Sequence, residues 1–344
     1  MKARDELYVG VEVGGTSVRA AVVDGVGHIL GQDLHRLQSK EPPQVAEAVV
    51  RAAKTACGAA GLPFGELKAM GLGIAGVVER GTGVVLLSPN LGWKDVALSR
   101  LLQARLPKLP LWVANELSVT AWGERAVGAG RGVDDLIVVL VGTGVGAGIV
   151  LGGKLHEGAT GLSGELGHLL VKPEGRACVC GRRGCLEAYA GGQNLAAWAR
   201  DDLRIALAAA RAAGRPLGSA GSASVGQKLL DQAGGDLEKI NLAAMERAAH
   251  QGCALSRRLL EEAGRLLGAE VARLVTVLNP ARLLLGGGVL AGSPRVLRAL
   301  NETIDAQASK ASRAALQIAA PGLGDDAGVV GAALLARASL QLAA

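Results

Sequence analysis

Two pairs of short apolar runs, each pair joined by a glycine-rich turn, stand at the start of the two halves of the chain. Leu7 to Val13 and Val18 to Val23 enclose the first turn, Gly14–Thr16, and Leu136 to Val141 and Val145 to Leu151 enclose the second, Gly142–Gly144. Short apolar runs bounded by turn residues are typical of buried strands. A shift of 130 residues superposes the first hairpin on the second and places Glu12 on Gly142. The pattern therefore predicts a weak internal repeat with one hairpin in each half.

The rest of the chain alternates between helical spacing and short apolar runs. Apolar residues three and four apart predict helices, and compact apolar runs between turn residues predict strands. The predicted helices cover residues 42–61, 96–106, 116–127, 186–212, 241–278 and 326–344, and the further predicted strands cover residues 70–75, 111–114 and 283–285. Residues 213–236 are rich in Gly, Ser and Ala and predict a loop or an insertion. This alternation of strands and helices predicts an α/β fold in two related halves.

Composition adds size and core chemistry to this picture. A length of 344 residues is typical of about two domains, and hydrophobic residues make up 49% of the chain. Aromatic residues are only 2%, so we expect cores of Leu, Val, Ala and Ile. The 51 glycines gather at turns and show no collagen-like period.

The net charge of +6 raises the question of an anionic partner. Arginines are spread along the predicted helices, and no basic run is interleaved with aromatic residues, so a solvated basic surface is the favoured interpretation and we expect no nucleic-acid partner. Polar residues precede the first apolar run, which argues against a signal peptide. The apolar stretch at 136–151 is broken by glycines and too short to span a bilayer. We therefore expect a cytoplasmic protein with no membrane partner.

The candidate chemistry is most concentrated between residues 165 and 187. His168, Cys178, Cys180 and Cys185 offer three thiolates and one imidazole, which is the ligand set of a closed tetrahedral zinc site. A redox pair or buried free cysteines are the alternatives. Cys57 and Cys253 stand alone and are expected to be buried as small apolar residues. Glu165 and Glu187 flank the cluster without being needed by the metal.

The glycine-rich turns are candidate phosphate-binding elements, because a turn without side chains exposes its backbone N–H groups. A single such turn is as often an ordinary hairpin. Two equivalent turns, together with Gly286, Gly287 and Gly288 after a predicted strand, favour a nucleotide held between two lobes. The chain has no Walker-type motif, and the Gly142–Gly146 turn leads into a strand rather than a helix, which argues against a Rossmann site.

These motifs resemble the ROK family of sugar kinases and related repressors, within the actin-like, hexokinase-like superfamily. The resemblance runs from about residue 7 to residue 340. It depends on the segments 11–16, 88–93, 115–116, 141–148, 164–168, 178–187 and 285–288. It implies an actin-like ATPase fold, related to ribonuclease H, with two related lobes around a cleft. A small lobe of residues 1–116, joined by the C-terminal helix at about 327–344, would face a large lobe of residues 117–326 that carries the zinc site.

The resemblance also implies a reaction and its residues. Members transfer the γ-phosphoryl group of ATP to a hexose hydroxyl, usually O6, and glucose is the expected hexose. The implied catalytic base is Glu116, and Glu12 helps to hold the Mg²⁺ that accompanies ATP. The implied phosphate and adenosine contacts are Gly14, Gly15, Thr16, Gly142, Thr143, Gly144, Gly286, Gly287 and Gly288, and the implied sugar contacts are Asn90, Asn115, Glu116, Glu165, His168 and Glu187. A homodimer or homotetramer is expected by the same analogy.

Three positions depart from the family pattern. Glu12 and Glu116 each stand where the family normally has Asp, and Ser17 stands where it often has Lys. An added methylene moves a carboxylate by roughly 1 Å, and a misplacement of that size can cost about 100-fold in rate. Because the zinc, sugar and phosphate positions are intact, a sugar kinase is the leading hypothesis, for glucose or for another hexose such as mannose, fructose or an N-acetylated sugar. The two glutamates motivate the second hypothesis, a catalytically weakened sugar-binding or sensor protein. A regulator would need a DNA-binding segment ahead of Glu12, where only eleven residues stand. ATP is preferred to polyphosphate, since nothing marks a basic channel.

Overall fold

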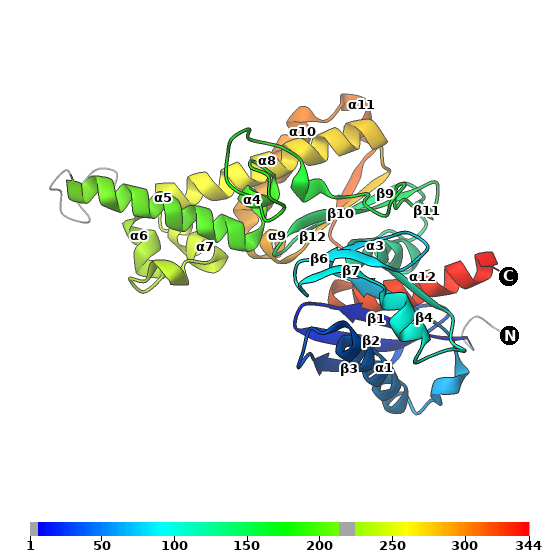
Figure 1. Ribbon diagram of the computed structural model, residues 1–344. Helices are drawn as coiled ribbons and strands as arrows, with labels where there is room; N and C mark the ends of the chain where they lie inside the picture. The colour runs from blue at the N-terminus through cyan, green and yellow to red at the C-terminus, as the bar shows by residue number, and fades with distance from the viewer. Residues whose placement is uncertain (1–5, 213–223, 344) are drawn as a thin grey trace.

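Two five-stranded mixed sheets with the same strand order form the framework of the computed structural model, which describes residues 6–212 and 224–343 (Figure 1). The first sheet has the order β3-β2-β1-β4-β8, built from β1 (Leu7–Val13), β2 (Ser17–Asp24), β3 (Ile29–Arg36), β4 (Leu67–Ile74) and β8 (Leu111–Asn115). The second has the order β11-β10-β9-β12-β13, built from β9 (Leu136–Val141), β10 (Val145–Leu151), β11 (Lys154–Leu155), β12 (Arg282–Gly286) and β13 (Gln317–Ala319).

The pairing directions agree strand by strand between the two sheets. In each, the first three strands form an antiparallel meander, and the fourth and fifth strands are added in parallel. The hairpins β1–β2 and β9–β10 are the two predicted from the sequence, and they occupy equivalent places. The predicted α/β fold and internal repeat are confirmed.

Two helices form the layer between the sheets. α3 (Glu116–Ala126) follows β8, and α12 (Ala327–Ala343) follows β13, so they are equivalent in the repeat. α12 packs on β1 and β4 of the first sheet, α3 packs on β9 and β10 of the second, and the two helices pack against each other (Figure 1). The residues that follow β8 and β13, at the starts of α3 and α12, therefore lie where the two sheets approach each other.

Glycines allow this close packing. A Cβ atom on Gly331 of α12 would lie 1.8 Å from the backbone oxygen of Val119 in α3. A Cβ atom on Gly10 of β1 would lie 1.7 Å from the oxygen of Val329 in α12. Real Cβ atoms cannot approach that closely, so any larger residue would force the layers apart.

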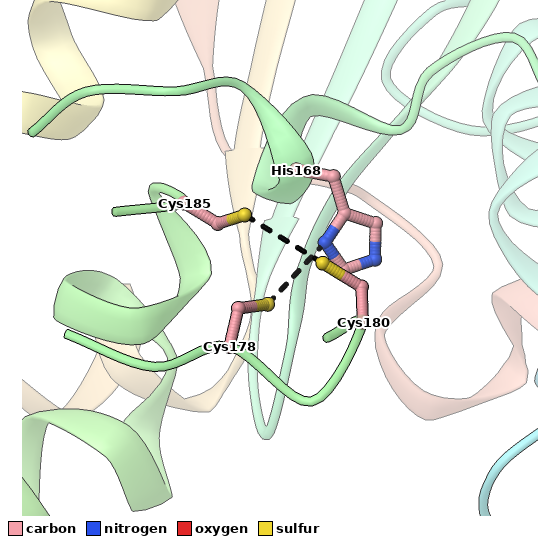
Figure 2. A group of neighbouring side chains, drawn as sticks. All are labelled: His168, Cys178, Cys180 and Cys185. Carbon is pink, nitrogen blue, oxygen red and sulfur yellow. Dashed lines mark hydrogen bonds between the residues drawn. The ribbon is translucent and has the colours of Figure 1, made fainter. Parts of the chain in front are cut away.

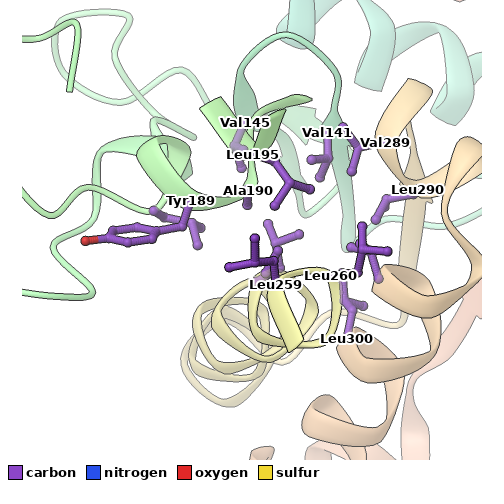
Figure 3. Packing of buried hydrophobic residues seen from close by; sticks show 14 of the residues in the cluster. Val141, Val145, Tyr189, Ala190, Leu195, Leu259, Leu260, Val289, Leu290 and Leu300 are labelled. Atoms are coloured by element: carbon purple, nitrogen blue, oxygen red, sulfur yellow. The ribbon is translucent and has the colours of Figure 1, made fainter. Parts of the chain in front are cut away.

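The second sheet is buried on both faces. Ile137, Val139 and Val141 belong to the largest core, which α8 (Ala254–Leu278) covers (Figure 3), whereas Leu136 and Val138 face α3. Alternate residues of one strand thus serve two cores, which explains why β9 is a continuous apolar run. α1 (Pro42–Ala59) packs on β2 and β3 of the first sheet. As expected, Cys57 and Cys253 are buried.

Several predicted elements have other bounds than expected. The helix predicted over 96–106 is only α2 (Leu98–Gln103), because the residues before it form β7 (Trp93–Val96). The helix predicted over 186–212 is divided into α4 (Glu187–Ala190) and α5 (Gly192–Ala212). The helix predicted over 241–278 is divided into α7 (Leu242–His250) and α8, because Gly252 adopts a φ of 87°. Within the predicted loop at 213–236, residues 224–232 form α6 (Ser224–Gln232), and residues 213–223 lie outside the described residues.

The remaining elements were not predicted. They include the sheet strands β3, β11 and β13, and also β5 (Val77–Val78) and β6 (Val85–Ser88), which form a small sheet with β7. The others are α9 (Gly288–Gly292), α10 (Pro294–Gln307), α11 (Lys310–Ala315) and the 3₁₀ turns Phe64–Glu66, Leu166–His168, Leu237–Lys239 and Gly324–Asp326. Among the helices of the described ranges, none is long and apolar enough to cross a membrane.

Candidate active site and metal centre

Glu116 stands at the first position of α3, where the chain leaves the first sheet. The preceding Asn115 caps this helix: its Oδ1 accepts a hydrogen bond from the N–H of Leu117 at 2.7 Å, and its Nδ2 donates one to the oxygen of Gly76 at 2.8 Å. This is the ordinary role of Asn before a helix. The structure therefore gives Asn115 a positioning role that the sequence had not suggested.

The Glu116 carboxyl group is poised to exchange a proton near neutral pH. Burial, with a smaller contribution from the negative charge of Glu12, raises its pKa to about 7. Both effects disfavour the charged carboxylate. A general base works best when its pKa lies near the working pH.

Glu12 lies at the end of β1, directly beside the start of α12. Its carboxylate is so close to Gly328 that a Cβ atom there would lie 2.7 Å from its Oε2. Burial raises the pKa of Glu12, the neighbouring Arg19 lowers it, and Asp325 raises it again. Arg19 also binds the Asp326 side chain and the oxygen of Asp325. The sequence analysis did not single out Asp325 or Arg19. The acidic pair Asp325 and Asp326, at the start of a predicted helix, was a signal that could have indicated the first of them.

Two adjoining cavities contain much of the predicted nucleotide site. The larger, of about 1170 Å³, lies between the sheets and is lined by Glu12, Arg19 and Asp325 on one side and by Gly286, Gly287 and Gly288 on the other. The smaller, of about 630 Å³, shares Gly288 and adds Gly142 and Thr143. It also contains Gln193, Arg200 and Asn241, which the sequence had not singled out.

The first glycine turn is not part of the lining of either cavity. Gly14 closes the β1–β2 turn by donating to the oxygen of Ser17, and Thr16 is exposed. Gly15 lies against Asn90, since a Cβ atom on it would be 3.0 Å from the Asn90 oxygen. Asn90 is exposed, and its backbone oxygen accepts a hydrogen bond from Lys40 at 2.8 Å.

Glu187 connects the cysteine cluster to the second glycine turn. It begins α4, two residues after Cys185, and its Oε2 accepts a hydrogen bond from the N–H of Val145 at 3.0 Å. The same oxygen would lie 2.6 Å from a Cβ atom on Gly144, so a larger residue there would displace the Glu187 carboxylate. Glu187 therefore links the cysteine cluster to the turn between β9 and β10.

Glu165 and His168 complete this group of predicted residues. The Nε2 atom of His168 lies 3.7 Å from Oε2 of Glu165. Burial raises the pKa of Glu165, His168 lowers it, and the charge of Glu187 raises it. The structure thus brings Glu165, His168 and Glu187 together, and it brings Glu12 and Glu116 together as a second group.

The four predicted metal ligands converge on one point (Figure 2). Their ligand atoms all lie within 4.8 Å of one another, with 3.7 Å between Sγ of Cys180 and Sγ of Cys185 and 3.7 Å between Sγ of Cys178 and Nδ1 of His168. Zinc at about 2.3 Å from sulfur and 2.0–2.1 Å from nitrogen gives tetrahedral edges of roughly 3.8 Å and 3.6 Å. A disulfide would need about 2.05 Å between sulfurs. The cluster can hold a tetrahedral metal ion, and Nδ1 rather than Nε2 of His168 faces it.

The fold and these two groups define a two-lobed α/β protein of the actin-like ATPase class, with its site where the sheets meet. The ROK family model matches residues 8–339, and the chain belongs to the ROK family. The glucokinase of Streptomyces coelicolor is 34% identical over 96% of this chain and 98% of its own length.

Solved structures agree with this assignment. A ROK family glucokinase from Streptomyces griseus, in complex with glucose and AMPPNP, has 34% identity and a TM-score of 0.73, covering 96% of this chain and 99% of that one. The ROK hexokinase of Thermus thermophilus has 30% identity and a TM-score of 0.76, covering 97% and 99%. A ROK family transcriptional regulator, a homologue of the Escherichia coli MLC protein, has 25% identity and a TM-score of 0.78, covering 98% of this chain and 79% of the regulator.

Proposed function

We propose that this protein is an ATP-dependent hexokinase that phosphorylates the 6-hydroxyl of a hexose, with glucose as the preferred substrate. The observation that carries the proposal is Glu116, a half-buried carboxyl group with a pKa of about 7 that feels the charge of Glu12, and Glu12 lines the cavity between the sheets. The glucokinases and the hexokinase among the similar proteins support the same reaction class.

The proposed step moves one proton and one phosphoryl group. The Glu116 carboxylate accepts the proton of the hexose 6-hydroxyl while that oxygen bonds to the γ-phosphorus of ATP. The bond between the γ-phosphorus and the bridging oxygen breaks, and ADP leaves with the electron pair. In this scheme the 1170 Å³ cavity holds the nucleotide, with Gly286–Gly288 on its adenosine side. The Gly142–Gly144 turn, which contributes Gly142 and Thr143 to the adjoining cavity, would contact its phosphates. The Gly14–Thr16 turn lines neither cavity and would have to move toward the bound nucleotide to do the same.

Glu12 fits a role in holding Mg²⁺. Its carboxylate is buried and shares the cavity with Asp325, and Mg²⁺ is commonly bound by one or two carboxylates together with substrate phosphates. The ion would supply positive charge beside the β- and γ-phosphates. Two negative groups at one wall of the cavity are stabilised by such a charge.

In the same proposal the hexose lies between the two groups of site residues. Glu165 and Glu187 offer acceptors to the sugar hydroxyls, His168 offers Nε2, and Asn90 and Asn115 offer amides. Asn115 already uses its oxygen to cap α3 and one N–H to bind the Gly76 oxygen, so one N–H remains for a hydroxyl. The small lobe would comprise residues 1–116 with the helix 327–344, and the large lobe residues 117–326.

We further propose that the metal in the cysteine cluster is a structural zinc ion. Its role is to fix the loop that presents His168 and Glu187 to the sugar. His168 would bind it through Nδ1, which leaves Nε2 directed toward Glu165, and such division of the two ring nitrogens is common in metal sites.

A coupled assay of ADP release over a panel of hexoses, with ATP and with polyphosphate as donors, tests the function. We expect ADP production with glucose and ATP, and a loss of about 100-fold or more in Glu116→Gln, with sugar binding retained in calorimetry. Sugar binding without sugar-dependent ADP in the wild type would contradict the proposal. That outcome would favour a sugar-binding protein weakened by Glu12 and Glu116.

A further inference from the structure

A third cavity, of about 800 Å³, lies away from the candidate active site. It is enclosed by the turn between β2 and β3, by the last turns of α3 and by the C-terminal half of α12. None of the predicted sugar, nucleotide or metal residues lines it. It therefore has no role in the proposed reaction.

The charged groups in the wall of this cavity are all basic. Arg125, Arg131 and Arg337 line it together with His28, and its lining contains no Asp or Glu. Three carboxylates stand just outside. Asp134 binds Arg125 at 3.0 Å, Glu6 lies 3.9 Å from Arg337, and Asp24 binds His28 at 2.9 Å.

Arg131 contributes a positive charge that is not neutralised within the described residues. Its side chain is exposed, and no hydrogen bond or ion pair engages it in that part of the chain. The other two arginines each keep N–H groups beyond those that their acidic neighbours use. The cavity wall thus has an excess of positive charge and of donors.

Unsatisfied donors are concentrated at the same place. Five buried side-chain nitrogen or oxygen atoms of the described residues lack a hydrogen-bond partner, and three of them belong to residues of this wall: Nε1 of Trp122, Nε of Arg125 and Nε of Arg337. Leaving a buried donor unpaired costs roughly 1–3 kcal/mol, and more for a charged group. All three are N–H donors, so the missing partner is an acceptor.

We propose that this cavity binds a small organic phosphate. Guanidinium groups match the geometry of phosphate oxygens, and three arginines around one cavity are a common way to hold that group. The volume lies in the range of small-molecule sites, about 300–1,000 Å³, and exceeds what inorganic phosphate alone would fill. Val127, Leu323 and Leu334 supply an apolar surface for the organic part. Arg125 and Arg337, whose Nε atoms have no hydrogen-bond partner among the described residues, would turn their guanidinium groups toward such a ligand.

Calorimetric titration with 3-phosphoglycerate tests the site, because this probe bears a phosphate and is not a hexose. We expect saturable binding to the wild-type protein, at least tenfold weaker in Arg131→Ala and in Trp122→Phe. Arg131→Ala is the safer variant, since within the described ranges that side chain has no hydrogen bond or ion pair to lose. Arg257→Ala, an exposed arginine on α8 away from the cavity, and Glu116→Gln, in the candidate active site, are matched controls that should retain binding.

Two results would overturn the proposal. One is the absence of saturable binding at millimolar probe. The other is equal binding in wild type, Arg131→Ala and Trp122→Phe when thermal melts show that both variants are folded. An inorganic phosphate titration completes the test, and affinity equal to that of 3-phosphoglycerate would refute the assignment of an organic ligand.

Discussion

At the scale of single residues, the proposed chemistry depends on the two glutamates at the junction of the sheets. Glu12 and Glu116 interact electrostatically, and burial raises the pKa of both. A glutamate reaches one methylene farther than the aspartate that the family pattern carries, so the pocket must have grown around it for the base to meet its proton. Asn115 supports this by fixing the first turn of α3.

The pKa of Glu116 predicts the pH dependence of the reaction. The carboxylate is the active form, and with a pKa of about 7 only about a tenth of it is deprotonated at pH 6. We therefore expect the hexokinase rate to fall about tenfold as pH decreases from 8 to 6, measured as kcat/KM. Glu116→Gln should abolish that limb of the profile along with most activity. Glu116→Asp provides a control on side-chain length, and a flat wild-type profile between pH 6 and 8 would contradict the role of Glu116 as base.

At the scale of elements, the candidate metal cluster connects two segments of the proposed sugar site. His168 belongs to a short 3₁₀ turn, and Cys185 lies two residues before Glu187, which binds the Val145 N–H. Fixing the four ligands at one point therefore fixes both segments. Without the metal, three thiols and an imidazole have little reason to stay together.

Removal of the metal tests this connection. Protein purified without added metal should contain about one zinc per chain by elemental analysis. Cys180→Ser should raise the KM for glucose several-fold with a smaller effect on kcat, because Glu116 lies on another element. Cys57→Ser, at a buried cysteine far from the cluster in sequence, should leave zinc content unchanged. A folded, active preparation free of zinc would refute the structural role.

The contact between α3 and α12 gives a second prediction at this scale. A Cβ atom at residue 331 would lie 1.8 Å from the oxygen of Val119, so Gly331→Ala must separate the two helices. We expect a loss of about 2–4 kcal/mol in the free energy of unfolding, measured by urea denaturation. Gly58→Ala in the exposed part of α1 meets nothing within 4 Å and should be neutral or stabilising by up to about 1 kcal/mol. Equal stabilities of the two variants would show that the helices can adjust.

At the scale of the whole molecule, Glu124 of α3 binds the segment through which the chain passes from the second sheet to α12. Its fully buried carboxylate accepts hydrogen bonds from the N–H groups of Ala129, Gly322 and Leu323 at 2.8–2.9 Å. The last two belong to the segment between β13 and α12. One side chain thus attaches that crossing to α3.

Glu124→Gln should weaken this attachment. An amide keeps only one acceptor oxygen and presents an NH₂ group to the backbone donors, so at least one N–H loses its partner. We expect a cost of about 1–3 kcal/mol in the free energy of unfolding. Glu302→Gln, at an exposed glutamate 3.8 Å from Arg298, should change stability by less than about 0.5 kcal/mol. Unfolding midpoints that do not differ between these variants would exclude the proposed role of Glu124.

The sequence by itself determined the elements whose signals are local. The apolar runs at β1, β2, β9 and β10, their glycine turns and the close spacing of three cysteines and a histidine each lie within about twenty residues, so periodicity and ligand chemistry were sufficient to predict them. The ends of the long helices were less accurate, because Gly252 interrupts a pattern that otherwise continues across it.

Only the tertiary structure decided which distant residues meet. It placed α3 and α12 between the sheets, set Glu12 beside Gly328 and Asp325, and gathered Arg125, Arg131 and Arg337 around one cavity. Apart from Arg125 and Arg131, which are near each other in the chain, these contacts join residues more than 200 positions apart, and no local pattern encodes them. They arise because two repeated sheets must bury their facing surfaces against the same pair of helices, and that requirement acts on the folded chain as a whole.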